Sequence, residues 1–177
     1  PLRPEMVKAL GLKGIKPQVA AICVYHSFVK TAVKALQNSK IRVAAVSTGF
    51  PHGLNSLPRR IDEIRDSIDD GAEEIDIVIT RAHVFSKNWQ ALYDEIRAFR
   101  EASGTAHLKT ILGTGELGTF RNVAKASLVC MMAGADFIKT STGKEGVNAT
   151  LPVSLVMLRM IREYQENTGY SVGFKPA

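Results

Sequence analysis

A lysine in the middle of a predicted β-strand is the first feature of this sequence that indicates chemistry. Lys139 stands in the segment 136–144 (DFIKTSTGK), where apolar and β-branched residues favour a strand. A strand packed on both faces has no favourable place for an ammonium group, so Lys139 needs a partner, a wet cavity or a lowered pKa. A flexible turn, 142–144, follows with a second lysine. Together they predict covalent amine chemistry on a phosphorylated carbonyl compound, although an isolated strand lysine more often extends to solvent.

A third lysine, near the end of the chain, strengthens this interpretation. Lys175 lies in the short strand-like segment 171–176. Two lysines on neighbouring strands lower each other's pKa by like-charge repulsion. Such repulsion is one way to obtain a neutral, nucleophilic amine near neutral pH. We therefore expect Lys175 to activate Lys139.

Two further charged residues stand within predicted strands. Asp76 lies between two isoleucines, and Lys109 lies between Leu108 and Thr110. The two-residue alternation of a strand directs each of them away from its apolar neighbours, which is consistent with an inward position in a barrel. The alternative for Asp76 is a structural carboxylate that neutralises a core lysine. One aspartate and three lysines would make a cavity net positive, which suits an anionic substrate and suppresses the pKa of at least one lysine.

Six strand segments alternate with helical patterns along the chain. The predicted strands are 19–25, 41–47, 74–79, 107–112, the start of 136–144, and 171–176. The first is almost continuously apolar, as expected for a strand covered on both faces. Helices are predicted within 4–10, 28–36, 56–71, 88–104, 119–134 and 150–169, with Ser56, Asn88, Thr119 and Thr150 as N-caps for the last four.

Equal strand–helix periods predict a parallel sheet, either a (β/α)8 barrel or a doubly wound open sheet. We favour the barrel because charged residues on several strands can converge at its carboxyl-end mouth. An open sheet collects a ligand mainly at one switch point, and no GxGxxG follows the first strand. A complete barrel takes about 250 residues and eight strands. We therefore expect one domain over 1–177, with about six of the eight βα units and without the first and last strands.

Composition excludes several classes of protein. The 177 residues carry a net charge of +6, but acidic residues are interleaved with basic ones, as in 59–66, which is typical of a solvated helix face and does not favour nucleic-acid binding. The sequence contains no run of about 18 apolar residues, so it predicts no membrane-spanning helix. Cys23 and Cys130 show no metal-binding spacing. Both are expected to be buried, reduced thiols of a cytoplasmic protein.

Several separate motifs together resemble the deoxyribose-phosphate aldolases, a family of class I aldolases. The segment 136–144 is the longest of them. The others are 147–150 (VNAT), 172–177 (VGFKPA), 74–78 (EIDIV), 115–117 (GEL) and 50–53 (FPHG). They occur in family order and cover essentially the whole chain, which makes the resemblance far more specific than one strand lysine.

The resemblance implies a (β/α)8 barrel and reversible cleavage of 2-deoxy-D-ribose 5-phosphate to D-glyceraldehyde 3-phosphate and acetaldehyde. It assigns the Schiff base to Lys139, pKa modulation and proton transfer to Lys175, and the proton relay to Asp76. The expected substrate-binding residues are Lys109, Thr142, Gly143 and Lys144. No metal or cofactor is implied, because the protonated imine is itself the electron sink. The family also places a cysteine near the pocket, which would be Cys23.

Two alternatives stay open at this stage. One is another class I phosphosugar aldolase or a related barrel enzyme, which would not need both strand lysines. The other is a truncated, non-catalytic barrel that acts as a binding module, because missing terminal strands would expose apolar edges. A homo-oligomer is expected on the grounds of the family alone.

Overall fold

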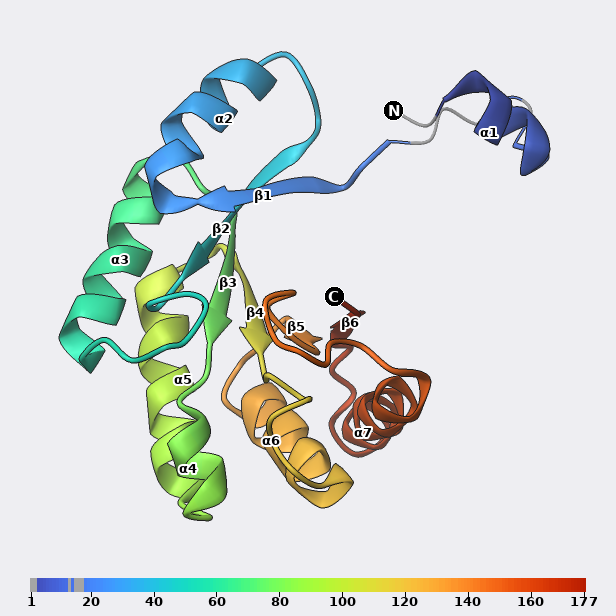
Figure 1. Cartoon of the computed structure of the whole chain (residues 1–177). Coiled ribbons are helices and arrows are strands. Elements are labelled where there is room, and N and C mark those ends of the chain that lie inside the picture. Colours follow the sequence, from blue (N-terminus) through green and yellow to red (C-terminus); the bar gives the residue numbers. More distant parts are fainter. Residues whose placement is uncertain (1–2, 13, 15–17) are drawn as a thin grey trace.

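The computed structural model describes residues 3–12, 14 and 18–177, and its centre is a curved sheet of six strands (Figure 1). Neighbouring strands are all parallel, and their order in the sheet is their order in the chain. The strands are β1 (Ala21–Tyr25), β2 (Arg42–Ser47), β3 (Glu74–Val78), β4 (His107–Ile111), β5 (Phe137–Lys139) and β6 (Gly173–Lys175).

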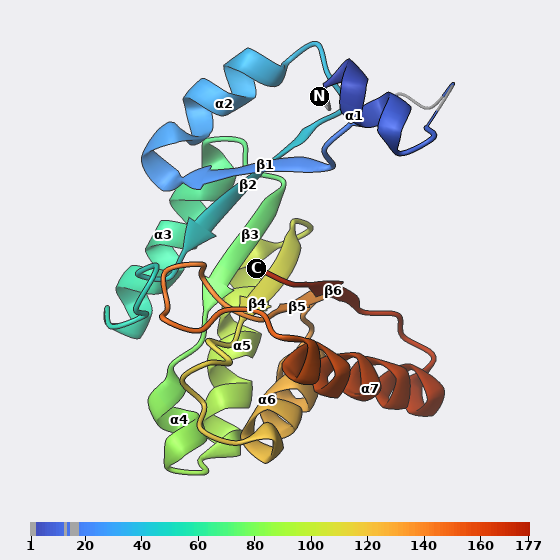
Figure 2. The same ribbon diagram turned by 45° about the vertical axis from the view of Figure 1, so that its right-hand side comes forward.

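The strand order decides between the two predicted architectures. A doubly wound sheet reverses direction at a switch point and carries helices on both faces. Here the order runs from β1 to β6 without reversal, and the helices that follow β1 in the chain succeed one another around the outside of the curved sheet (Figures 1 and 2). This is the arrangement of a (β/α)8 barrel. The predicted partial TIM-type barrel is therefore confirmed.

The helices form where the apolar stripes predicted them. The N-cap side chains of Asn88, Thr119 and Thr150 each accept a hydrogen bond from a first-turn backbone N–H, whereas Ser56 stands at its N-cap without such a bond. The short α4 was missed because five residues are too few for a periodic pattern. The helices are α1 (Pro4–Ala9), η1 (His26–Phe28), α2 (Val29–Leu36), α3 (Leu57–Asp69), α4 (Arg81–Phe85), α5 (Trp89–Ser103), α6 (Phe120–Met132) and α7 (Leu151–Thr168).

Strand alternation divides the sheet into an apolar outer face and a charged inner face. Ile75 and Ile77 of β3 are fully buried in the core against the helices, together with Phe99 of α5. Asp76 lies between the two isoleucines and therefore points to the opposite face. The same alternation places Lys109 and Lys139 on that inner face. The core thus fixes which side chains of each strand can meet inside the barrel.

The first strand differs from its prediction. Ile22, Cys23 and Tyr25 of β1 are exposed, although the apolar run predicted a strand covered on both faces. The reason is that β1 lies at an edge of the described sheet and pairs only with β2. Apolar character reports what a strand can bury, not which neighbours it has. The expectation that Cys23 is buried was wrong, whereas Cys130 is buried as predicted.

A buried ion pair fastens two helices to the ends of β2 and β3. Arg60 of α3 donates to Glu95 of α5 at 2.6 Å, to the hydroxyl of Thr80 at 2.7 Å and to the carbonyl of Thr48 at 3.1 Å. Glu95 also accepts the Thr80 backbone N–H at 2.9 Å. Arg60 lies in the segment that was interpreted as a solvated helix face, yet only 2% of it is exposed. That interpretation was wrong for this residue.

Removal of the Glu95 carboxylate should destabilise the fold strongly. We expect Glu95→Ala to lower the free energy of unfolding by about 3–5 kcal/mol, because Arg60 is left buried without its counter-ion. The matched control is Glu101→Ala in the same helix, where the carboxylate is largely exposed and pairs with Arg97 at 3.7 Å. Its effect should stay within about 1 kcal/mol. Denaturant unfolding measures both, and equal losses would contradict the assignment.

Candidate active site

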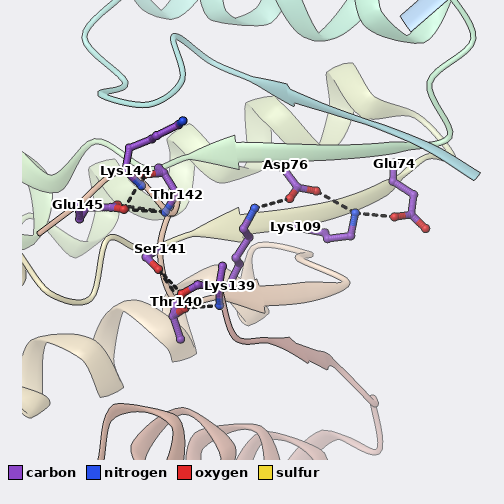
Figure 3. Close-up of polar contacts among 10 residues, drawn as sticks. Glu74, Asp76, Lys109, Lys139, Thr140, Ser141, Thr142, Lys144 and Glu145 are labelled. Carbon is purple, nitrogen blue, oxygen red and sulfur yellow. Dashed lines mark hydrogen bonds and ion pairs between the residues drawn. The ribbon is translucent and has the colours of Figure 1, made fainter. Parts of the chain in front are cut away.

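Four charged side chains form a continuous chain of ion pairs across β3, β4 and β5 (Figure 3). Lys109 Nζ lies 2.6 Å from Glu74 Oε2 and 2.8 Å from Asp76 Oδ1. Lys139 Nζ lies 2.8 Å from the other Asp76 oxygen, Oδ2. Asp76 therefore holds both ammonium groups at once, and positive and negative charges alternate along the chain.

The register of the strands explains this geometry. Asp76 of β3 is level with Lys109 of β4, and Lys109 is level with Phe137 of β5. Lys139 is thus two residues nearer the carboxyl end of the sheet, where it pairs with Ile111 on one side and Lys175 on the other. Its long side chain reaches back to Asp76. The structure therefore brings together three of the predicted residues: Asp76, Lys109 and Lys139.

Burial makes the carboxylate of Asp76 depend on its partners. Asp76 has no exposed surface, and Lys109 and Lys139 are each 5% exposed. Burial alone would raise the pKa of Asp76, but the charges and hydrogen bonds of Lys109 and Lys139 outweigh it and hold the pKa below its ordinary value. Asp76 is thus kept as an anion inside the barrel.

Glu74 is the member of the cluster that the sequence interpretation missed. It is 7% exposed and stands two residues before Asp76 on the same face of β3. Burial would lower the pKa of Lys109, but Asp76 and Glu74 together raise it above the ordinary value. The four paired groups carry two charges of each sign instead of the predicted positive excess. The two-residue spacing from Asp76 was the available signal.

Lys175 lies beside this cluster, without an ion pair in the described part of the chain. It is opposite Lys139 in the β5–β6 register and lines an open cavity of about 510 Å³ with Asp76 and Lys109. Cys23 lines the same cavity. Partial burial and the Asp76 carboxylate raise the pKa of the Cys23 thiol despite the nearby lysines, which does not favour a reactive thiolate.

The residues after β5 fix the end of β6 against it. Thr140 Oγ1 accepts from the backbone N–H of Ala177 at 3.0 Å, and the Ser141 hydroxyl donates to the Ala177 carbonyl at 2.8 Å. Both residues are fully buried. These contacts secure the strand that carries Lys175 beside the strand that carries Lys139.

The predicted phosphate turn is closed by a carboxylate. Both the backbone N–H and the hydroxyl of Thr142 donate to Glu145, at 2.9 and 2.5 Å (Figure 3). Burial would raise the pKa of Glu145, but the hydrogen bonds from Thr142 lower it. Gly143 has a φ of +84°, which favours glycine, and Lys144 is exposed beside it. Gly143 and Lys144 are therefore accessible, whereas the donors of Thr142 already have a partner.

Two glycines after β4 allow this turn to pack closely. A Cβ atom at Gly115 would lie 2.2 Å from the carbonyl oxygen of Val147, and one at Gly113 would lie 2.8 Å from Arg81 Nη1. Arg81 in turn pairs with Glu116 at 3.0 Å and approaches Glu145 at 3.9 Å. The segment 113–115 is thus a site of close packing against Arg81 and Val147.

Substitution at Gly115 should displace the loop after β5. We expect Gly115→Ala to destabilise the protein by about 1–3 kcal/mol and to speed amide hydrogen exchange at 145–148, because backbone cannot yield as a flexible side chain does. Gly146→Ala is the control, since nothing lies within 4 Å of a Cβ atom there. Equal exchange at 145–148 in both variants would refute the contact.

Comparison with known proteins agrees with this site. The model of the family described as "DeoC/LacD family aldolase" matches residues 5–177. The chain belongs to this aldolase family. Over 179 aligned residues it is 57% identical to the protein named deoxyribose-phosphate aldolase of Homo sapiens, covering 100% of this chain and 56% of that protein. It is 46% identical to a putative deoxyribose-phosphate aldolase of Caenorhabditis elegans, covering 97% and 59%.

Solved structures of the same kind share the fold. A putative deoxyribose-phosphate aldolase from Coccidioides immitis superposes with a TM-score of 0.81 at 29% identity, over 93% of this chain and 64% of that one. One from Toxoplasma gondii gives 0.77 at 25% identity, over 97% and 69%. The chain spans about half the length of the curated relatives it matches. Within the described residues, no helix is both long and apolar enough to cross a membrane.

Proposed function

We propose that this chain carries the Schiff-base centre of a deoxyribose-phosphate aldolase. The reaction would be reversible cleavage of 2-deoxy-D-ribose 5-phosphate to D-glyceraldehyde 3-phosphate and acetaldehyde. The observation that carries the proposal is Lys139, a buried strand lysine 2.8 Å from Asp76, which is a buried carboxylate that lines an open cavity. The names of relatives at high identity over the whole chain support it.

The first half of the reaction is formation of an imine. Lys139 attacks the aldehyde carbon, C1, as a neutral amine, so the proton that it shares with Asp76 must first leave. The resulting carbinolamine loses water and becomes an iminium ion. The iminium draws the electrons of the C2–C3 bond as that bond breaks, which is why the proposal requires no metal or cofactor.

The second half requires a base and then an acid. As the C2–C3 bond breaks, the C3 hydroxyl loses its proton and D-glyceraldehyde 3-phosphate departs, leaving an enamine on Lys139. Asp76, through a water molecule, would accept that proton and later return one to C2. Lys175, which is level with Lys139 in the β5–β6 register and lines the cavity with Asp76, would assist these transfers. Hydrolysis then releases acetaldehyde and restores the amine.

The remaining predicted residues would bind substrate rather than react. Gly143 and Lys144 offer an accessible backbone and a positive charge for the phosphate group. Thr142 would bind phosphate only if it exchanged its contact with Glu145, and otherwise shapes the turn. Lys109 would act electrostatically through Asp76. We further propose a homo-oligomer in the cytoplasm; a deoxyribose-phosphate aldolase from Aeropyrum pernix is described as a tetramer.

Trapping the imine with borohydride tests the proposal directly. The intact protein is incubated with 2-deoxyribose 5-phosphate, reduced and digested, and the added mass is located. We expect a substrate-dependent adduct at Lys139, because reduction converts the imine to a stable secondary amine. Lys139→Met should give no adduct and no turnover. Lys175→Met should keep the adduct on Lys139 but form it more slowly.

The distribution of the adduct separates the alternatives. An adduct on a different lysine would overturn the assignment of Lys139 as the nucleophile. An intact, folded protein that forms no adduct at all would favour the non-catalytic binding module. Lys30→Met, a surface lysine paired with Asp70, is the control for nonspecific labelling and should react like the wild type.

A further inference from the structure

The carboxylate of Glu74 holds a place in the ion-pair chain that the proposed reaction does not use. Glu74 is the first residue of β3 and is buried. Its oxygen Oε2 contacts Lys109 at 2.6 Å, the shortest of the three ion-pair contacts among the four charged side chains. Its other oxygen, Oε1, lies 3.8 Å from Arg42 Nη1 and 3.9 Å from His107 Nδ1. One oxygen thus faces the interior, and the other faces the amino ends of β2 and β4.

The charged groups around Glu74 are unequal in their dependence on it. Arg42 from β2 and His107 from β4 have side chains that are 45% and 42% exposed, so water can solvate them. Arg42 also approaches the exposed Glu73 at 4.0 Å. Lys109 from β4 has a side chain that is only 7% exposed, and among the described residues its ammonium contacts two carboxylates, Glu74 and Asp76. Lys109 is therefore the neighbour that needs Glu74.

Removal of Glu74 would leave one carboxylate for two buried ammonium groups. Asp76 would then be shared by Lys109 and Lys139, and the cluster would carry an excess positive charge. A buried excess charge is relieved most easily by loss of a proton from one lysine. Glu74 prevents that loss at Lys109, because it places a second negative charge 2.6 Å from the ammonium.

We propose that Glu74 is a positioning residue that keeps Lys109 charged and fixed on Asp76 throughout the catalytic cycle. When Lys139 is bound covalently to substrate, it no longer offers Asp76 an ammonium with three free hydrogens. Lys109 is then the permanent partner that keeps Asp76 ionised until Asp76 accepts the C3 hydroxyl proton, and Glu74 keeps Lys109 in that role. The catalytic part of this inference rests on the proposed aldolase function, whereas the electrostatic part does not.

The electrostatic part is tested without substrate by nuclear magnetic resonance. The titration of Lys109 is followed through its side-chain 13Cε signal in the intact protein. In the wild type we expect Lys109 to titrate above 10.5, its ordinary value. Glu74→Gln, which keeps the shape but removes the charge, should lower the midpoint by roughly 1–3 pH units. Glu73→Gln, which alters the adjacent and exposed carboxylate, should leave it unchanged.

The catalytic part is tested by the pH dependence of turnover. We expect the alkaline limb of kcat/KM to move to lower pH in Glu74→Gln, in step with the Lys109 titration, with a larger effect on kcat than on KM. A structural role alone would lower activity equally at all pH values. Glu73→Gln should again match the wild type.

Specific results would overturn the inference. If Lys109 titrates alike in Glu74→Gln and the wild type, Glu74 does not hold its charge. If Glu74→Gln does not fold, the wild-type titration decides: a midpoint at or below 10.5 refutes the proposal. Absence of an adduct at Lys139 would refute the aldolase function but leave the titration result intact, so the two failures are distinguishable.

Discussion

Ionised side chains inside a barrel must find partners, and this requirement shapes the centre of the molecule. Asp76 is fully buried, and an isolated carboxylate there would take up a proton instead of staying charged. Two ammonium groups at 2.8 Å prevent this, and the second of them, Lys109, is held in turn by Glu74. The chain of pairs spans three adjacent strands. A one-residue slip between any two would direct the charges to opposite faces, so the register of the sheet and the integrity of the site are the same constraint.

The outer part of the molecule supports that register. Apolar residues on the outer face of the strands pack against the helices, and the Arg60–Glu95 pair joins two of these helices to the ends of β2 and β3. Beyond the strand ends, Gly115 lets the segment after β5 approach the loop after β4, and Gly113 leaves room there for the side chain of Arg81 from α4. The turn that follows Lys139 is therefore held by backbone packing and by Glu145, not by the strands alone.

Local patterns predicted much of the fold and part of the site. Alternation along a strand was enough to direct Asp76 and Lys109 inward, and cap residues such as Thr119 and Thr150 marked helix starts. Contacts between distant segments were not predictable in this way. Arg60 resembles its exposed neighbours in the sequence, and only Glu95, in another helix, makes its burial possible. Likewise, nothing near Cys23 reveals that β1 lies at an edge of the described sheet, and Thr142 gives no sign that Glu145 occupies its donors.

The central claim is that Lys139 reacts while Lys109, held by Glu74, stays paired with Asp76. A crystal structure of the borohydride-reduced adduct of the intact protein with 2-deoxyribose 5-phosphate tests it most directly. The account predicts carbon bonded to Lys139 Nζ, Asp76 still in contact with Lys109, and Lys109 still in contact with Glu74. An adduct on Lys175, or an Asp76 side chain turned away from Lys109 in that complex, would contradict it.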